Sequence, residues 1–286
     1  MTRRAMLTIG ASALAVALAP PPPADASMSG RPRGRANFVS SCAYSHSAPD
    51  DPIVRPGEPG AAHLHDFFGN TTTDAGSTAE SLRGRSTTCR RGLDTAAYWT
   101  PALYDGGRLV RPRTVAAYYQ TAGKEPATIQ PFPAGLRMVA GPGPGTAQWA
   151  CSRRGRDSTT SATGPPDCRE GDDLVVRVFF PDCWDGRNLD SADHHSHMAY
   201  NVGGTCPASH PVPVPRLRLG FHYRGTDGGG DVTLSSGGPD TAHADFFNAW
   251  DQAELERLVR DCLDAAVHCG GRGPDALPAR PMRPRR

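Results

Sequence analysis

The chain has 286 residues, and its 31 Lys and Arg nearly balance its 29 Asp and Glu, for a formal net charge of +2. This composition gives no reason to expect a nucleic-acid partner, because proteins of that class concentrate basic residues on one surface. Apart from the N-terminus, no stretch approaches the roughly 20 apolar residues of a membrane-spanning helix, so no integral membrane segment is expected.

The N-terminus has the pattern of a signal peptide. Arg3 and Arg4 precede an uncharged apolar run over residues 5–19, and four prolines follow it. The run is shorter than a membrane span, and small residues at positions 24 and 26 suit cleavage before Ser27. We therefore expect a signal peptide over residues 1–26 and a secreted, extracellular protein. The paired arginines leave both the general and the twin-arginine export routes open.

The chain after the signal peptide divides into three expected parts. A flexible segment covers residues 27–37, a single globular β-rich domain covers residues 38–269, and a disordered basic tail covers residues 270–286. The globular span has no long low-complexity linker that would separate two domains. Arginine and proline dominate the tail, which is typical of a solvated, disordered end. We expect a monomer.

Eight cysteines follow the expected signal peptide: Cys42, Cys89, Cys151, Cys168, Cys183, Cys206, Cys262 and Cys269. An even number of cysteines in an exported chain indicates disulfide bonds. No C-x-x-C pair occurs, which argues against a structural zinc cluster or a thioredoxin-like centre. We favour pairing in sequence order, because it closes short loops. Cys262 and Cys269 fit this scheme only if their helix ends before Cys269, because a continuous helix would hold them about 10 Å apart.

Glycine and proline divide the domain into short segments, which favours an antiparallel β fold over βαβ units. The strand-like segments are enriched in β-branched and aromatic residues. We expect a mainly β, single-domain fold of the β-sandwich or jelly-roll type, with long loops and disulfide staples. The expected strands cover residues 114–120, 136–140, 174–180, 197–202 and 217–223.

One stretch near the C-terminus has the pattern of an amphipathic helix. Asp251 and Glu254 resemble a capping box, and apolar residues follow from Leu255 at spacings of three and four. The opposite face is charged. We expect this helix to pack on the sheet.

Histidines and acids gather in three short segments, which are His63-Leu-His65-Asp66, Asp193-His-His195-Ser-His197 and His243-Ala-Asp245. In an extended strand, residues two apart point to the same face, so each segment presents a pair of such side chains. Convergence of the three pairs would create one site. The first and third segments also resemble each other, since both continue into a Phe-Phe pair.

Imidazole and carboxylate groups together suit either acid–base catalysis near neutral pH or binding of a divalent metal. Asp66 is positioned in sequence to orient the imidazole of its neighbour His65. For the metal alternative, the expected ligands are His63, His65, His195 and His197. For catalysis, the expected residues are His63, His65, Asp66, His195, His197, His243 and Asp245.

Aromatic residues with polar neighbours suggest a sugar-binding cleft, because sugar rings stack on flat apolar faces whose edges carry hydrogen-bonding groups. Arg137 would meet an acidic group on the glycan. The expected substrate-binding residues are Tyr98, Trp99, Tyr119, Arg137, Trp184, Asp185 and Trp250.

The chain resembles the secreted domain-of-unknown-function family numbered nineteen ninety-six, found in actinobacteria and filamentous fungi. The resemblance covers roughly residues 38–269 and rests on long motifs, such as His63-Leu-His65-Asp66-Phe67-Phe68-Gly69-Asn70 and Phe180-Pro-Asp-Cys183-Trp184-Asp185-Gly186. Further matching motifs cover residues 51–57, 97–104, 131–138, 193–200, 206–211 and 243–251. The resemblance implies an extracellular domain, joined in some fungal members to wall-associated carbohydrate-binding modules. No such module is present in this chain.

Two function hypotheses follow. The first is a carbohydrate-active enzyme, a glycoside hydrolase or polysaccharide lyase, that acts on an extracellular or cell-wall polysaccharide through the His/Asp segments. A lyase would use a histidine to remove a proton while Arg137 or a metal neutralises a uronate, and a hydrolase would use a carboxylate pair from Asp66, Asp245 and Asp185. The second is a non-catalytic, wall-associated protein that binds a glycan or a metal.

Overall fold

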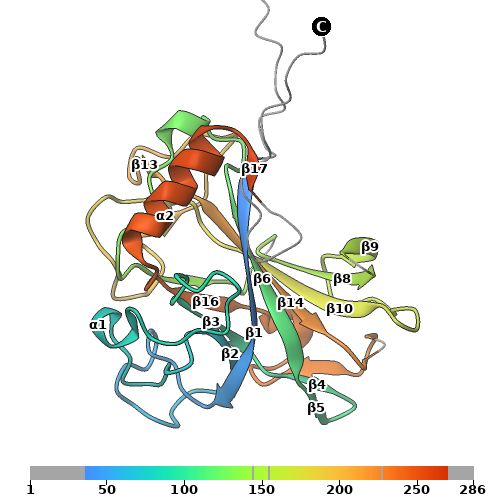
Figure 1. Ribbon diagram of the computed structural model, residues 1–286. Coiled ribbons are helices and arrows are strands. Elements are labelled where there is room, and N and C mark those ends of the chain that lie inside the picture. The colour runs from blue at the N-terminus through green and yellow to red at the C-terminus, as the bar shows by residue number, and fades with distance from the viewer. Residues whose placement is uncertain (1–35, 144, 154, 227, 270–286) are drawn as a thin grey trace, which may run out of the picture. The chain divides into compact units, whose positions relative to one another are not determined.

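The computed structural model describes residues 36–143, 145–153, 155–226 and 228–269 (Figure 1). The expected signal peptide, most of the expected flexible segment and the basic tail lie outside the described residues. Within the described part, the fold is mainly β, with a curled antiparallel sheet, a helix near the C-terminus and four disulfides. The predicted fold class is confirmed.

The main sheet has the strand order β7-β16-β3-β2-β1-β6-β14-β10-β8-β9, and every neighbouring pair in this order is antiparallel. Its strands are β1 (Asn37–Ala48), β2 (His65–Gly69), β3 (Ala97–Pro101), β6 (Pro112–Gln120), β7 (Arg137–Ala140), β8 (Ala147–Arg153), β9 (Arg156–Ser161), β10 (Asp173–Phe179), β14 (Arg216–Tyr223) and β16 (Ala244–Phe247).

Short elements complete the fold. Strand β17 (His268–Cys269) pairs in parallel with the start of β1. One small sheet joins β12 (Met198–Ala199), β11 (Cys183–Trp184) and β13 (Val212–Pro213), and another joins β15 (Val232–Leu234), β4 (Leu103–Asp105) and β5 (Arg108–Val110). Single helical turns are α1 (Ala79–Leu82), η1 (Pro126–Thr128) and η2 (Pro239–Thr241).

Strand β1 links the two halves of the main sheet, as Figure 1 shows by its long path between β2 and β6. Its first residues pair with β6 up to Ala43, and its last pair with β2 from Tyr44 onward. The register with β2 shifts between Tyr44 and His46. A bulge of this kind bends a strand and increases its twist, which accounts for part of the curl of the sheet.

Apolar residues cover both faces of the β2-β3-β16-β7 part of the sheet. The larger core lies on one face and includes Phe68, Tyr98, Phe246 and Met138. A smaller cluster lies on the other face and consists of Ile53, Phe67, Leu82, Ala97, Trp99, Val139, Phe247 and Ala249. Alternation of side chains along each strand therefore sends neighbouring residues into different surroundings.

Helix α2 (Gln252–Leu258) begins where the sequence predicts. The Asp251 side chain accepts a hydrogen bond from the Glu254 N–H, and Leu255 and Leu258 are buried. The chain continues as a π-helical segment, η3 (Val259–Asp264), and then leaves the helix. No helix in the described part of the chain is long and apolar enough to cross a membrane.

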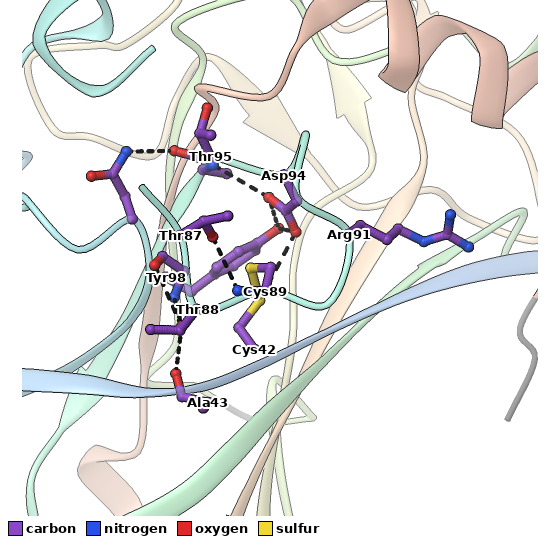
Figure 2. The surroundings of a disulfide bond; sticks show 12 residues. Cys42, Ala43, Thr87, Thr88, Cys89, Arg91, Asp94, Thr95 and Tyr98 are labelled. Carbon is purple, nitrogen blue, oxygen red and sulfur yellow. Dashed lines mark hydrogen bonds between the residues drawn. A yellow bond between two sulfur atoms is a disulfide. The ribbon is translucent and has the colours of Figure 1, made fainter. Parts of the chain in front are cut away.

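The four disulfides follow sequence order, as predicted: Cys42–Cys89, Cys151–Cys168, Cys183–Cys206 and Cys262–Cys269. Because η3 ends at Asp264, Cys269 folds back to a Cα–Cα distance of 5.6 Å from Cys262. Figure 2 shows the first bridge, with the carboxyl group of Asp94 and the ring of Tyr98 next to it.

Four of the five predicted strands are confirmed as β6, β7, β10 and β14. The strand predicted over residues 197–202 is wrong, since β12 covers only Met198–Ala199 and Val202 forms an isolated bridge with Thr205. The Asp193 carboxylate accepts hydrogen bonds from the N–H groups of His195 and Ser196, which folds the preceding segment into a turn.

Candidate functional site

Strands β2 and β16 flank β3 and carry the two similar sequence segments. Phe67 on β2 and Asp245 on β16 both lie opposite Trp99 of β3. In the same register, His65 lies opposite Pro101, and continuing β16 by one residue brings His243 to the equivalent position. The histidines of the two segments therefore correspond in space.

The rings of three histidines lie in contact at this place. The centroids of His63 and His65 are 4.2 Å apart, those of His63 and His243 are 5.1 Å apart, and those of His65 and His243 are 5.9 Å apart. One nitrogen of each ring lies within 4.8 Å of one nitrogen of the other two. We call His63, His65, His243, Asp51 and Asp245 the histidine–carboxyl cluster.

Backbone carbonyls fix the orientation of two of these rings. His65 Nδ1 donates to the Asp50 carbonyl at 2.9 Å, and His243 Nδ1 donates to the Thr241 carbonyl at 2.8 Å. Each ring therefore turns its Nε2 lone pair toward the cluster. The Nε2 atoms of His63 and His65 are buried without a hydrogen-bond partner among the described residues.

Two carboxyl groups belong to the same cluster. Asp245 is fully buried, and neither of its oxygens has a hydrogen-bond partner in the described part of the chain. Asp51 uses one oxygen to accept the N–H groups of Ile53 and Val54, both at 2.9 Å. One oxygen of Asp51, one oxygen of Asp245 and one nitrogen of His65 lie within 4.8 Å of one another.

Burial determines the charge of these groups. It lowers the pKa of His63, lowers that of His65 well below the usual value, and lowers that of His243 to about 4. Burial, together with nearby Asp51, raises the pKa of Asp245 well above the usual value. Near neutral pH the imidazoles are therefore uncharged bases, and Asp245 is ionised only if a cation accompanies it.

A cleft of about 380 Å³ lies beside the cluster. Val139 in its wall pairs with Asp245, and Gly141 is so close to His243 that an added Cβ would lie 3.1 Å from the His243 Cα. The other wall comes from the loop before β12. The residues lining the cleft are Met138, Val139, Gly141, Pro142, Thr146, Pro181, His194, His195, Met198 and Tyr200.

Two histidines bring basic groups to this cleft. His195 is exposed, whereas His194 is half-buried and its Nδ1 lies 3.0 Å from the Asp190 carboxylate. His194 is also near enough to Asp51 to lower the pKa of that carboxyl, against the larger effect of burial, which raises it. Asp190 in addition pairs with Arg137 at 3.4 Å. An acidic partner beside a histidine orients the ring.

The sequence model of the family described as "Domain of unknown function (DUF1996)" matches residues 51–250 of the chain. The chain belongs to this family. The matched span of the DUF1996 domain contains the whole histidine–carboxyl cluster and every residue that lines the cleft. No curated protein and no solved structure gives a significant match to the chain.

Two predicted catalytic residues of the DUF1996 domain lie elsewhere. Asp66 points to the face opposite His65, accepts the Ser47 hydroxyl at 2.6 Å, and has its pKa raised by burial to about 6. The ring of His197 is buried between Ser191 Oγ at 2.9 Å and the Arg137 carbonyl at 2.7 Å, so neither of its nitrogens is available. Both expectations are corrected: Asp66 belongs to the core side of β2, and His197 holds the cleft loop against β7.

Neither His195 nor His197 lies with His63 and His65: the nitrogens of His197 are engaged, and His195 is exposed in the loop that lines the cleft. Their place beside His63 and His65 is taken by His243, with Asp51 and Asp245. Sequence reasoning missed Asp51 as well as the pair His194 and Asp190. Asp51 lies in a turn with no strand periodicity, so only its neighbours in space reveal it.

Burial also corrects most of the predicted sugar-binding residues. Tyr98, Trp99 and Tyr119 are fully buried and Trp250 nearly so, which leaves no ring face for a glycan. Trp184 is half-buried and donates to the Asn188 carbonyl, and the exposed Asp185 caps the same turn. Arg137 is not fully buried and lies on the face that carries Asp245, with its guanidinium 4.8 Å from the centre of the Phe247 ring.

Proposed function

We propose that this protein is a secreted carbohydrate-active enzyme that cleaves an acidic extracellular polysaccharide, with the histidine–carboxyl cluster and the adjoining cleft as its catalytic centre. The observation that carries the proposal is the set of buried and half-buried imidazoles and carboxyls beside an open cleft, in which the Nε2 atoms of His63 and His65 and both oxygens of Asp245 are buried without a hydrogen-bond partner among the described residues. Unsatisfied buried polar groups cost free energy, so a fold that keeps several together supports a functional role for them.

Four disulfides in a domain of this size support maturation in an oxidising compartment. The signal-peptide pattern at the N-terminus supports export as well. An extracellular polymer is therefore the substrate class that such an enzyme would meet.

The position of the carboxyl groups favours elimination over hydrolysis. A glycosidase needs two carboxyl groups that face each other across the scissile bond, about 5–10 Å apart. Of the three carboxyls predicted for that role, Asp66 lies on the opposite face of the sheet and Asp185 is engaged in its own turn. Asp245 remains, but it is fully buried.

In elimination, one histidine acts as base on the carbon that bears the uronate carboxylate. His195 at the cleft takes that proton, and the electron pair of the C–H bond forms a carbon–carbon double bond. The C–O bond to the next sugar breaks, and its oxygen takes a proton from water. Arg137, or a cation if the cluster holds one, would supply positive charge for the uronate and stabilise the anion that develops.

The test is incubation of the purified secreted protein with a panel of polysaccharides, uronate-containing and neutral, with and without added divalent metals. We expect new reducing ends together with ultraviolet absorbance from the unsaturated product, on uronate polymers only. The His195→Ala variant should lower the rate by about 100-fold or more, because general-base catalysis contributes 10²–10⁴-fold. The His268→Ala variant removes an exposed histidine on β17 and should cleave like the wild type.

New reducing ends without ultraviolet absorbance would show that the enzyme cleaves by hydrolysis and not by elimination. Intact substrates throughout the panel, in a protein that still binds a glycan or a metal, would overturn the enzyme and support the second hypothesis, a non-catalytic wall-associated binding protein. The unpartnered ring nitrogens of the cluster support metal binding under either hypothesis, because a protein can hold an ion without catalysing a reaction.

A further inference from the structure

The three histidines of the cluster have the arrangement that metal ligands have in proteins. His65 and His243 each donate Nδ1–H to a backbone carbonyl, which places the lone pair on Nε2. Histidine ligands almost always donate their other ring N–H to a carbonyl or carboxylate in this way, because the bond fixes the tautomer and the ring orientation. The two carbonyls belong to Asp50 and Thr241, each in a backbone segment outside β2 and β16.

Asp245 adds an observation that is independent of the histidines. Its carboxyl group is fully buried, and within the described ranges both oxygens lack a hydrogen-bond donor. A buried carboxyl without partners is costly, and proteins keep such groups where they are paired with a cation or coordinate a metal. The described residues place no Lys or Arg in an ion pair with it; its neighbours include the rings of the cluster, the carboxyl of Asp51 and Trp99, which lies opposite it on β3.

We propose that His63, His65, His243 and Asp245 bind one divalent transition-metal ion, with the free oxygen of Asp51 available as a fifth ligand. The ligand atoms lie within 4.8 Å of one another in each of two groups, His63–His65–His243 and Asp51–His65–Asp245. Both groups contain His65, so an ion bound to the His65 ring would lie next to the members of both. Strands β2 and β16 supply ligands from both sides of β3, and the turn after β1 supplies Asp51.

The donor set selects the class of metal. Three imidazole nitrogens and one or two carboxylate oxygens suit Zn²⁺ and other first-row transition metals, whereas Mg²⁺ and Ca²⁺ require mainly oxygen ligands. Cys42, Cys89 and Asp94 also lie within 4.8 Å of one another, but the two cysteines are joined to each other and offer no thiolate. The histidine–carboxyl cluster is thus the place for a transition metal in the described part of the chain.

A catalytic role for this ion rests on the proposed function. An ion at the cluster would lie next to Val139 and Gly141, which line the cleft, and from there it would help to neutralise a uronate carboxylate and leave His195 free as the base. The proposed metal site itself depends only on the geometry of its ligands and does not require that the protein acts on a polysaccharide.

The test is metal analysis of the purified secreted protein, followed by removal of metal with a chelator and calorimetric titration with Zn²⁺. We expect one equivalent of transition metal and 1:1 rebinding. The His243→Ala and Asp245→Asn variants should weaken Zn²⁺ binding by more than the 10- to 100-fold that loss of an outer hydrogen-bond partner causes. Co²⁺ bound in place of Zn²⁺ should give a visible absorption band that both variants lose.

Matched controls keep the result interpretable. The His268→Ala variant and the His195→Ala variant should bind Zn²⁺ like the wild type, because neither residue belongs to the ligand set. Circular dichroism of His243→Ala and Asp245→Asn shows whether each variant is folded before it is titrated, and Asp245→Asn preserves the shape of the side chain. Failure of the wild type to bind Zn²⁺, or unchanged binding in both ligand variants, overturns the metal site.

The two proposals fail separately. Stoichiometric Zn²⁺ without cleavage of any polysaccharide overturns the proposed function and leaves the metal site standing. Cleavage that survives complete removal of metal, in a protein that does not bind Zn²⁺, overturns the metal site and leaves the proposed function standing.

Discussion

The carboxyl group of Asp94 lies fully buried beside the Cys42–Cys89 bridge (Figure 2). It accepts the Tyr98 hydroxyl at 2.9 and 3.1 Å. The Tyr119 hydroxyl lies 2.7 Å from that of Tyr98, and the Trp250 indole N–H donates to Tyr119 at 2.9 Å. The hydroxyl and indole N–H groups of these three predicted sugar-binding residues therefore form hydrogen bonds with one another and with Asp94 inside the core.

Asp94 should make folding stability depend on pH. Burial, opposed by hydrogen bonds and Arg91, raises its pKa from 3.8 to about 7. A raised pKa means that the unfolded chain loses this proton first, so the contribution of Asp94 to stability is largest below about pH 4 and is lost as pH rises from about 4 to 7. The full loss is on the order of a few kcal/mol, since one pKa unit corresponds to about 1.4 kcal/mol.

The measurement is urea unfolding of the wild type and Asp94→Asn between pH 4 and pH 8. The variant keeps an acceptor for Tyr98 and has no carboxyl to ionise, so its curve should be flatter than that of the wild type across this window. Parallel curves would show that Asp94 is ionised in the folded protein.

At the scale of elements, the repeated segments on β2 and β16 match through their histidines and differ in their aspartates. Asp66 follows His65 directly, whereas Asp245 lies two residues after His243. Since strand side chains alternate, this single step sends Asp66 toward the larger core and Asp245 into the cluster. The sequence predicts which residue types gather, but a difference of one position decides which of them meet.

Helix α2 offers a test of local capping. The Asp251 side chain accepts the Glu254 N–H at 2.9 Å at the start of the helix. The Asp251→Ala variant should lose about 1 kcal/mol of stability, because the Glu254 N–H is left without its acceptor and a favourable negative charge at the helix start is lost. Glu256→Ala on the exposed face of the same helix is the matched control and should change the free energy of unfolding by less than about 0.5 kcal/mol. Equal losses in urea unfolding would show that the cap contributes nothing specific.

At the scale of the whole molecule, the disulfides join segments at very different separations. Cys42–Cys89 spans 47 residues and ties β1 to the loop before β3, whereas Cys262–Cys269 spans 7 residues at the end of η3. A cross-link restricts the unfolded chain more when it closes a longer loop.

Removal of Cys42–Cys89 should therefore destabilise the protein more than removal of Cys262–Cys269. With both cysteines of a bridge changed to alanine, loop entropy alone predicts a difference of about 2 kcal/mol between the two variants. Guanidinium unfolding of the two double variants under non-reducing conditions measures it. A larger loss from the short bridge would show that the local packing of η3 outweighs chain entropy.

The sequence by itself determined the family, the mainly β class, the start of α2, the order of the disulfides and the importance of three histidine segments. These features depend on residue types and on spacings within one segment. It did not reveal strand β1, because Phe38, Ser40 and Cys42 alternate into the interior without an apolar run.

Only the tertiary structure decided which of the predicted site residues meet. Pairing of β2 and β16 with the same strand brought His63, His65 and His243 together. Asp51 joined them from a turn that is distant from β3 and β16 in the sequence. The same pairing buried Tyr98 and Trp99. His197 in the loop before β12 donates a hydrogen bond to the Arg137 carbonyl and so attaches that loop to β7. The physical reason is that strand register, which no single segment contains, determines the face to which each side chain points.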